Sequence, residues 1–533
     1  MSSQCRSILP SKLYRAEQIK QNEADCAHRN GIDLYQLMEK AGHAVFDCVL
    51  ARFPTAQHIL IIAGGGNNGG DAYIVARLAI QSGMNVTLLA KNKGEALEGD
   101  AKVAMHSFVS AQGTVLDLDK HLDSIRQLDV DVIVDGLIGI GLEQTLRAST
   151  AEVIEAINHN SAPVIAIDVP SGLNANTGQP LPIAVIADYT VTFIALKPGL
   201  FSLDGPDHCG QLIYSELGLR KEFESSVSTD LSLIHRDTIV PIPKRKQNVH
   251  KGSFGTVLVI GGALGMGGAA FMAGKAALRS GVGKVYVMCE AGNEGMITQL
   301  CPELMVTGLE MLEVDRYLAE VLPKVDSVVV GPGLGLTKWS LAVISELLKQ
   351  ETWYQTPSVI DADGINCLAY KLDKQDGATQ DAFARPDKPW VFTPHPLESA
   401  RILGETVQSV QADRLGAAQR IVNKTNSAVI LKGNGSIVAS KGHSAINMSG
   451  NPAMATAGMG DVLSGVIGAS FCAWQLNQTS LQKKLEIATY LHGLAGDFTA
   501  KESKIGMIAT DVIESLPAAI WNCQEYNNKV QGN

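Results

Sequence analysis

The sequence predicts an α/β protein with two domains, each built on a mostly parallel sheet that carries helices on both faces. Apolar β-branched runs alternate with helical patterns through the first half of the chain, and the alternation restarts after residue 250. The chain's 533 residues are too many for one hydrophobic core, and a hydrophobic content of 46% supplies apolar side chains for two. Glycine-rich segments follow several apolar runs, which is typical of ligand loops in this class.

Five apolar runs in the first half are expected to be strands, because β-branched residues dominate them and turn residues bound them. They cover residues 58–63, 85–90, 130–135, 163–168 and 189–195. Helical patterns follow at 72–81, 100–111 and 148–158, and residues 14–50 are expected to form one or two earlier helices. The first domain is therefore expected to be a parallel sheet covered by helices.

A change of composition at residues 222–250 predicts a domain boundary. A serine-rich stretch at 225–229 precedes Pro241, Ile242 and Pro243, and no regular pattern spans them. We place the first domain at residues 1–225 and the second at residues 236–533. Strands of the second domain are expected at 255–262, 284–289, 327–331, 358–361, 390–393 and 428–432, and residues 461–521 are expected to be mostly helical.

Charge, cysteine usage and hydropathy limit the location and the partners of the chain. A net charge of −10 and a pI near 5.7 argue against nucleic acid as a partner. The nine cysteines show no CxxC or Cys/His metal spacing, which indicates free thiols in a reducing compartment. No apolar segment resembles a signal peptide or a bilayer span, so we expect a cytoplasmic protein without a membrane partner.

Four polar or glycine-rich loops follow the predicted strands of the first half, at 64–71, 135–141, 168–172 and 197–199. The first, GGGNNGGD, opens a helix whose N–H groups favour an anion, but it lacks the GxGxxG pattern of ordinary NAD sites. Asp135 and Asp168 each end an apolar run, where a single Asp is most often a helix cap. Because parallel strands bind ligands at their carboxyl ends, two such residues beside glycine-rich loops favour one shared site.

These loops, taken in order, resemble the NAD(P)H-hydrate epimerase domain, a Rossmann-like three-layer fold, over about residues 10–220. The resemblance implies that hydrated NADH or NADPH is bound by Asn67, Asn68, Gly69, Gly70, Asp71, Gly139, Ile140, Gly141, Leu142, Glu143, Gln144 and Thr145. It also implies that Asp168 contacts the reacting part of the substrate, with Lys197 as an assisting residue. Asn68, Asp135 and Ser171 would ligate a potassium ion, which oxygen ligands suit. Inverting a hydroxylated ring carbon requires a proton-transfer group, and a carboxylate such as Asp168 supplies one.

The second half carries its own series of motifs at strand ends. GPGLG at 331–335, DADGIN at 361–366, TPHPLE at 393–398 and KGNGS at 432–436 precede the small-residue run NPAMATAGMGD at 451–461. The backbone N–H groups of that run favour a developing phosphate charge, and Asp461 at the start of a helix can take a proton from a hydroxyl. Asp461 can also act as a helix cap. For His395 we favour a positioning role over proton transfer with Glu398, since two prolines make its turn rigid.

With the preceding HKG at 250–252, this set resembles the NAD(P)H-hydrate dehydratases of the ribokinase-like superfamily, an α/β fold, over about residues 236–520. The implied substrate contacts are Ala269, Gly333, His395, Pro396, Leu397, Glu398, Ser399, Ala400, Arg401 and Asp461. The implied nucleotide contacts are Lys432, Gly433, Asn434, Gly435, Ser436, Asn451, Pro452, Ala453, Met454, Ala455, Thr456, Ala457, Gly458, Met459 and Gly460. The resemblance further implies magnesium on the phosphates of ADP or ATP, phosphorylation of the ring hydroxyl with Asp461 as general base, and loss of phosphate.

Four residues depart from the motifs of these families. Ala72 stands where a glycine is usual, Leu397 likewise, and Ala453 and Met459 replace smaller residues. Each added side chain is expected to narrow its site.

Two other classes of function remain open from the residues. A ribokinase-like domain can phosphorylate a vitamin precursor, such as a thiazole, and release it as a stable product. The first fold also occurs as a scaffold in RNA-decay assemblies, although Asn68, Asp71, Asp135 and Asp168 are all present and favour catalysis. Between ADP and ATP we favour ADP, and we expect a homo-oligomer.

Overall fold

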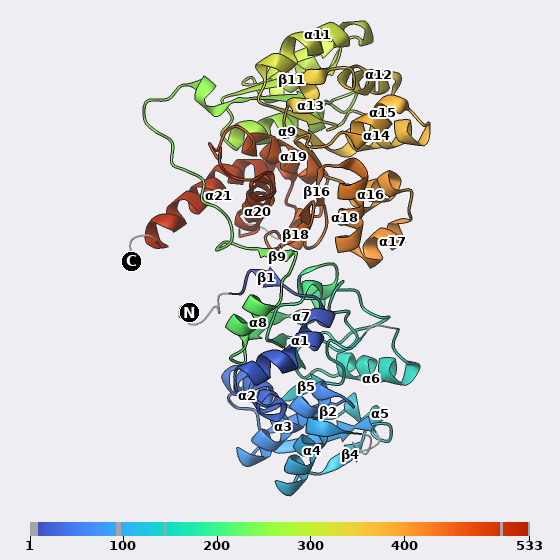
Figure 1. Cartoon of the computed structure of the whole chain (residues 1–533), viewed down its shortest axis with the longest axis vertical. Coiled ribbons are helices and arrows are strands. Elements are labelled where there is room, and N and C mark those ends of the chain that lie inside the picture. Colours follow the sequence, from blue (N-terminus) through green and yellow to red (C-terminus); the bar gives the residue numbers. More distant parts are fainter. Residues whose placement is uncertain (1–8, 92–96, 143–144, 502–504, 531–533) are drawn as a thin grey trace. The chain divides into compact units, whose positions relative to one another are not determined.

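The computed structural model divides the chain into two compact units, Met1–Ser232 and Leu233–Asn533, which are described separately. Figure 1 shows the ribbon of both units with their elements labelled. The structure describes residues 9–91, 97–142, 145–501 and 505–530. Within these residues, no helix has the length and apolar character needed to cross a bilayer. The eight cysteines in the described part of the chain are all free, as expected.

The first unit contains a seven-stranded parallel sheet in the order β4-β3-β2-β5-β6-β7-β8. Its strands are β2 (His58–Ala63), β3 (Asn85–Ala90), β4 (Val115–Asp117), β5 (Val132–Gly136), β6 (Val164–Ile167), β7 (Tyr189–Phe193) and β8 (Gln211–Ser215). A short strand β1 (Lys12–Leu13) pairs in antiparallel fashion with the start of β9 (Leu231–Ile234). The carboxyl ends of β2, β5, β6 and β7 are neighbours in the sheet, which brings the loops after them to one edge.

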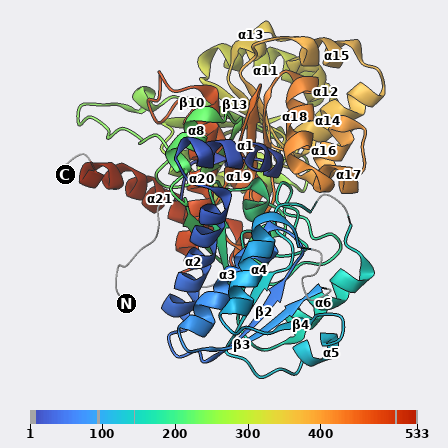
Figure 2. The ribbon, with the colours of Figure 1, turned by 60° about the horizontal axis from the view of Figure 1, so that its bottom comes forward.

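Helices cover both faces of this sheet, because alternate residues of each buried strand point to opposite sides. On β2, Ile59 and Ile61 join one apolar cluster and Leu60 and Ile62 join another. Figure 2 shows α2, α3 and α4 together at one face and α5 and α6 at the other. The helices are α1 (Ala16–Arg29), α2 (Leu34–Arg52), α3 (Asn67–Gln81), α4 (Gly99–Ser110), α5 (Leu122–Ile125), α6 (Ala148–His159), α7 (Gly205–Cys209) and α8 (Arg220–Ser226).

All five strands predicted for the first half are present, with ends that differ by at most two residues. The start of α3 differs more, because the helix begins at Asn67 rather than at residue 72. Most of the predicted loop 64–71 is therefore the first turn of a helix. A Cβ at Gly69 would lie 2.0 Å from the carbonyl oxygen of Gly64, so only glycine lets this turn approach the strand end so closely.

The second unit contains a larger sheet whose strands run in the order β18-β17-β16-β15-β14-β13-β10-β11-β12. The strands from β16 to β12 are parallel, and β17 and β18 continue the sheet in antiparallel fashion. They are β10 (Thr256–Ile260), β11 (Lys284–Glu290), β12 (Met305–Leu309), β13 (Ser327–Val330), β14 (Ser358–Ile360), β15 (Trp390–Phe392), β16 (Ala428–Leu431), β17 (Ile437–Ser440) and β18 (His443–Asn447). The six predicted strands are all present, whereas β12, β17 and β18 were not predicted.

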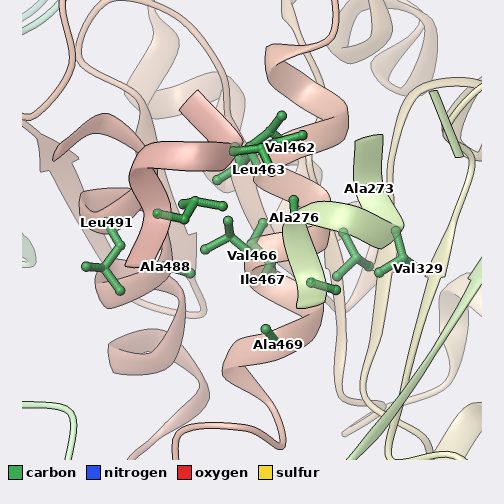
Figure 3. Packing of buried hydrophobic residues seen from close by; sticks show 14 of the residues in the cluster. Ala273, Ala276, Val329, Val462, Leu463, Val466, Ile467, Ala469, Ala488 and Leu491 are labelled. Carbon is green, nitrogen blue, oxygen red and sulfur yellow. The ribbon is translucent and has the colours of Figure 1, made fainter. Parts of the chain in front are cut away.

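An apolar core joins one face of this sheet to α9 (Gly267–Arg279), α19 (Met459–Ser470), α20 (Leu481–Thr499) and α21 (Ala509–Val530). Figure 3 shows Ala273 and Ala276 of α9 against Val462, Val466 and Ile467 of α19. A Cβ at Gly465 would lie 2.1 Å from the carbonyl oxygen of Ala273, so small residues let the two helices pack closely. This packing fixes α19, and with it the residues at its N-terminus.

The other α-helices of the second unit lie between the strands in the chain. They are α10 (Glu294–Leu300), α11 (Val314–Val321), α12 (Lys338–Leu347), α13 (Glu351–Gln355), α14 (Ala362–Asp373), α15 (Gly377–Ala384), α16 (Pro396–Leu403), α17 (Val407–Ala412) and α18 (Arg414–Thr425). The helices α14 and α16 begin directly at the carboxyl ends of β14 and β15. Their first residues therefore lie at the same edge as the segment that follows β16.

Candidate active sites

Asp168 is held at the end of β6 by an unusual backbone conformation and by a buried lysine. Its φ of 66° is rare for a residue with a side chain, and such conformations cluster at functional sites. Its Oδ1 accepts hydrogen bonds from the Oγ1 of Thr192 (3.1 Å), the N–H of Phe193 (3.0 Å) and the Nζ of Lys197. In the described part of the chain Oδ2 takes no hydrogen bond. Asp168 caps no helix, and it keeps one carboxylate oxygen available for a ligand.

Lys197 is the charged partner of Asp168 and is 1% exposed. Its ammonium also donates to the Oγ1 of Thr192 and to the carbonyl oxygen of Phe193, each at 3.0 Å. Three acceptors match the three N–H bonds of the ammonium, so the side chain has one defined position. The sequence named Lys197 as an assisting residue, and the structure brings it into direct contact with Asp168.

Two further carboxyl groups lie near Asp168, and sequence analysis missed one of them. Burial, and next the charge of Asp168, raise the pKa of Glu23 on α1 to about 7. Burial also raises the pKa of Asp71, and the charges of Asp168 and Glu23 add to the effect. Glu23 belongs to no motif, because it reaches the site from a helix that precedes the sheet. The N–H of Tyr14, two residues before α1, donates to the carbonyl oxygen of Leu196 at 2.9 Å. This bond joins the start of α1 to the residue before Lys197.

The residues predicted to hold potassium are gathered beside this site. Asp135 is fully buried and accepts from the N–H (2.8 Å) and the Oγ (2.6 Å) of Ser171, and burial raises its pKa. Among the described residues it has no ion-pair partner. Asn68 lies on the facing loop, because a Cβ at Gly139 would lie 3.0 Å from its Oδ1, and its Nδ2 is buried without a partner. A buried carboxylate without a cationic side chain, next to amide and hydroxyl oxygens, fits a monovalent cation.

The other predicted residues of the first site are distributed as follows. Asn67 to Asp71 form the first turn of α3 at the edge, and Gly139 to Leu142 and Thr145 are partly or fully exposed. Glu143 and Gln144 lie outside the described residues. Ala72 does not narrow the loop as expected. It is fully buried, and a Cβ at Gly136 would lie 2.6 Å from its methyl group, so the glycine on β5 makes room for it.

In the second unit, Asp461 lies in the first turn of α19. The turn begins at Gly458, whose φ of 90° suits glycine alone. Burial raises the pKa of Asp461 to about 7, with the charges of Asp361, Asp363 and Glu398 acting in the same direction and Lys432 opposing them. A carboxyl group that titrates near neutral pH is suited to general base catalysis.

The segment before Asp461 is largely exposed and is held by its own hydrogen bonds. Pro452, Ala455, Thr456 and Ala457 are exposed, and the Asn451 Oδ1 accepts from the N–H of Ala453 at 3.1 Å. The Asn451 Nδ2 donates to Asp497 of α20 at 2.9 Å, which anchors the segment. Met459 does not narrow the site as expected, because its side chain is 8% exposed and joins the core under α19. Ala453 also packs partly against that core.

His395 caps α16. Its Nδ1 accepts from the N–H of Leu397 (3.1 Å) and of Glu398 (3.4 Å), and its own N–H donates to the Oε2 of Glu398 at 2.7 Å. Leu397 points outward with 44% exposure. Arg401 donates to the Oδ1 of Asn366 at 2.7 Å, so the TPHPLE and DADGIN motifs meet.

Other predicted residues gather around this cluster. Gly333 and Ala269 are neighbours, because a Cβ at Gly333 would lie 3.0 Å from that of Ala269. Arg414, which sequence analysis missed, is 4% exposed and donates to the carbonyl oxygen of Asn434 at 2.5 Å. It supports the turn formed by residues 432–436 from α18. No local motif marks Arg414, since it lies about twenty residues before the turn that it holds.

Two parallel sheets, each with a held carboxylate at its carboxyl edge, define the class as a two-domain α/β enzyme with two separate sites. A family model described as NAD(P)H-hydrate dehydratase matches residues 257–518, and one described as YjeF-related protein N-terminus matches residues 34–199. The bifunctional NAD(P)H-hydrate repair enzyme of Coxiella burnetii is 37% identical over 507 residues, which cover 95% of this chain and 98% of that protein. The enzyme of the same description from Escherichia coli K12 is 37% identical over 512 residues, 95% of this chain and 94% of its own.

A relative from Leishmania braziliensis with that description is 36% identical over 529 residues, covering 96% of this chain and 94% of its own. A solved structure of the ADP/ATP-dependent NAD(P)H-hydrate dehydratase of Bacillus subtilis, co-crystallised with ATP and Mg²⁺, is 26% identical. It aligns with 55% of this chain and 96% of its own, at a TM-score of 0.44. The chain belongs to the family of bifunctional NAD(P)H-hydrate repair enzymes.

Proposed function

We propose that this chain repairs hydrated NADH and NADPH in two steps carried out by its two units. The first unit interconverts the R and S forms, and the second dehydrates the S form to NAD(P)H with ADP or ATP. The observation that carries the proposal is one chain that holds both Asp168 on Lys197 and Asp461 at the start of α19. A single-handed dehydratase alone would leave half of the damaged nucleotide unrepaired.

In the first site, Asp168 is the proton-transfer group. Lys197 keeps Oδ1 occupied, so the proton moves at Oδ2. The substrate's phosphates bind near the N–H groups at the start of α3. The predicted contacts at 67–71 and 139–145 surround the ring. Asn68, Asp135 and Ser171 would hold potassium, which supplies positive charge beside the α3 loop when bound.

In the second site, Asp461 removes the proton from the ring hydroxyl while that oxygen attacks the terminal phosphorus of the nucleotide. The N–H groups at the N-terminus of α19, at residues 458–460, stabilise the charge on the transferred phosphoryl group. The C–O bond to phosphate then breaks, a proton leaves the adjacent ring carbon, and NAD(P)H, phosphate and AMP or ADP are the products. Magnesium would neutralise the nucleotide phosphates, held partly through water. We favour ADP as the donor.

The residues predicted to contact the hydrated nucleotide, apart from Asp461, belong to segments that follow β10, β13 and β15, and those predicted to contact ADP follow β16 and β18. We also expect the active protein to be a cytoplasmic homo-oligomer. The free cysteines of the described chain suit a reducing compartment.

The test mixes the purified chain with both epimers of hydrated NADH, magnesium, and either ADP or ATP. Complete recovery of NADH absorbance with one donor supports both activities and identifies the donor. Asp461→Asn is the matched control, since it keeps the size of the side chain and removes the base. It is expected to lower the rate of dehydration by at least about 10²-fold, while the R and S forms still interconvert. A stable phosphorylated product without recovered NADH would instead indicate a small-molecule kinase and refute the proposal.

A further inference from the structure

The second site contains a lysine, Lys432, that is paired with carboxylates of the protein rather than left free to bind a phosphate. The Nζ of Lys432 lies 2.8 Å from the Oδ1 of Asp361 and 3.9 Å from the Oε2 of Glu398. Asp361 is 1% exposed, and the Oγ1 of Thr393 donates to the same Oδ1 at 2.7 Å. Strand ends of β14, β15 and β16 thus supply one buried network. The partners of the Lys432 ammonium are therefore carboxylates of the protein itself, and its position does not depend on a bound nucleotide.

The same ammonium lies directly under the first turn of α19. A Cβ at Gly460 would be 3.1 Å from the Nζ of Lys432 and 3.8 Å from the Oδ2 of Asp361. Gly460 is the residue before Asp461, so the ammonium is adjacent to the turn that carries the general base. A side chain at position 460 would therefore crowd the ammonium of Lys432.

The charges that act on Asp461 come from three segments that follow β14, β15 and β16. Asp361 and Asp363 face it from the start of α14, Glu398 from α16 and Lys432 from the end of β16. His395 caps α16 beside Glu398, Arg401 lies one turn further along α16, and His492 of α20 lies behind Lys432. Burial lowers the pKa of both histidines, so they are neutral near pH 7. Three carboxyl groups therefore oppose ionisation of Asp461, and Lys432 favours it.

We propose that Lys432 is a positioning residue for the general base. Its ammonium, fixed by Asp361 beside the turn that carries Asp461, favours the ionised carboxylate that takes the proton from the substrate hydroxyl. The family resemblance had placed Lys432 among the nucleotide contacts. In this role it acts through Asp461 and contributes little to nucleotide affinity. The inference rests on the proposed dehydratase function and deepens it.

Further support comes from the state of Lys432 itself. Burial acts to lower the pKa of this lysine, but the charges of Asp361 and Glu398 outweigh it, and the pKa is raised. The side chain is therefore charged throughout the working pH range. Glu398 is the opposite case, because burial raises its pKa to about 7. Removing Lys432 or Glu398 is thus expected to move the titration of Asp461 in opposite directions.

The experiment measures dehydration of hydrated NADH against pH with saturating nucleotide, for wild type, Lys432→Met, Lys432→Arg and Glu398→Gln. An opposite charge within a few ångströms changes a carboxyl pKa by about 1–3 pH units. The acid limb of the rate–pH profile of Lys432→Met is therefore expected at least about one pH unit higher than that of wild type. Its KM for the nucleotide is expected to stay within about threefold of the wild-type value. Lys432→Arg should return the limb to its wild-type position, and Glu398→Gln should move it to lower pH.

A second measurement does not depend on turnover. Carboxyl ¹³C chemical shifts of the unliganded chain are followed against pH, with Asp461 assigned from the signal missing in Asp461→Asn. An unchanged Asp461 titration in folded Lys432→Met, or a nucleotide KM raised tenfold with an unmoved acid limb, would overturn the proposal. If Lys432→Met does not fold, the direction of the Glu398→Gln change decides. A wild type that shows this titration but never forms NADH refutes the proposed function and leaves the charge pairing supported.

Discussion

Replacement of Asp168 by Asn tests the first site most directly, because it removes a charge and keeps the shape. Lys197 has three acceptors, and the amide oxygen of Asn still serves as one of them. The ammonium, 1% exposed, would nevertheless lose its counter-charge. Breaking a buried ion pair from one side costs about 3–5 kcal/mol. Since all three hydrogen bonds can persist, we expect the lower end, about 3 kcal/mol in the free energy of unfolding of the first unit.

The effect on activity is separate from the effect on stability. Loss of an acid/base group lowers a rate by about 10²–10⁴-fold. The second unit supplies the assay, because only the S form is dehydrated. With both epimers and a nucleotide, wild type should consume all of the substrate. Asp168→Asn should stop when the S form is used, apart from slow spontaneous interconversion. The burst of S consumption shows that the variant chain is folded and active.

Lys197→Met and the double variant Asp168→Asn/Lys197→Met complete the cycle. Because the double variant buries neither charge, it should recover most of the lost stability while remaining inactive as an epimerase. Thermal unfolding of the first unit, followed by calorimetry, measures the coupling. Full conversion of the R form by Asp168→Asn at the wild-type rate would refute the acid/base role, and equal stability of all four chains would refute the buried pair.

Three other changes follow from the same contacts. Glu23→Gln should remove a pH dependence of epimerisation near pH 7, because the pKa of Glu23 is raised to about 7; an identical pH profile would contradict its participation. Ser171→Ala should abolish a rise in the melting temperature of the first unit when KCl replaces tetramethylammonium chloride, and an equal rise in both chains would exclude Ser171 as a ligand. His492→Gln should reduce the loss of folding stability of the second unit at acid pH. The folded pKa of His492 is lowered to about 4 by burial, so its contribution is complete above about pH 6.5 and is lost toward pH 4, by about 3 kcal/mol; denaturant unfolding at both pH values measures it.

Local patterns were sufficient to predict the strands that end at the two sites. The runs at 58–63 and 85–90 match β2 and β3 residue for residue, because apolar runs of this length with β-branched residues strongly favour strands. The edge strands β4, β8 and β12 were missed because they are half-exposed, and the interior strands β17 and β18 were missed because each is short and carries polar residues. The start of α3 was missed because glycines disfavour helices in isolation, and only close packing on the strand end offsets that cost.

The sequence by itself determined the order of the motifs, and with it the two folds, the family and the candidates Asp168 and Asp461. Tertiary structure alone decided which charges surround them. Glu23 reaches Asp168 from a helix well over a hundred residues earlier, and Asp361 at the end of β14 holds Lys432 at the end of β16, with β15 between the two strands. The side chains of Ala72 and Met459 point into cores rather than into sites. The physical reason is that pKa values and side-chain directions depend on neighbours in space, which residue order does not specify.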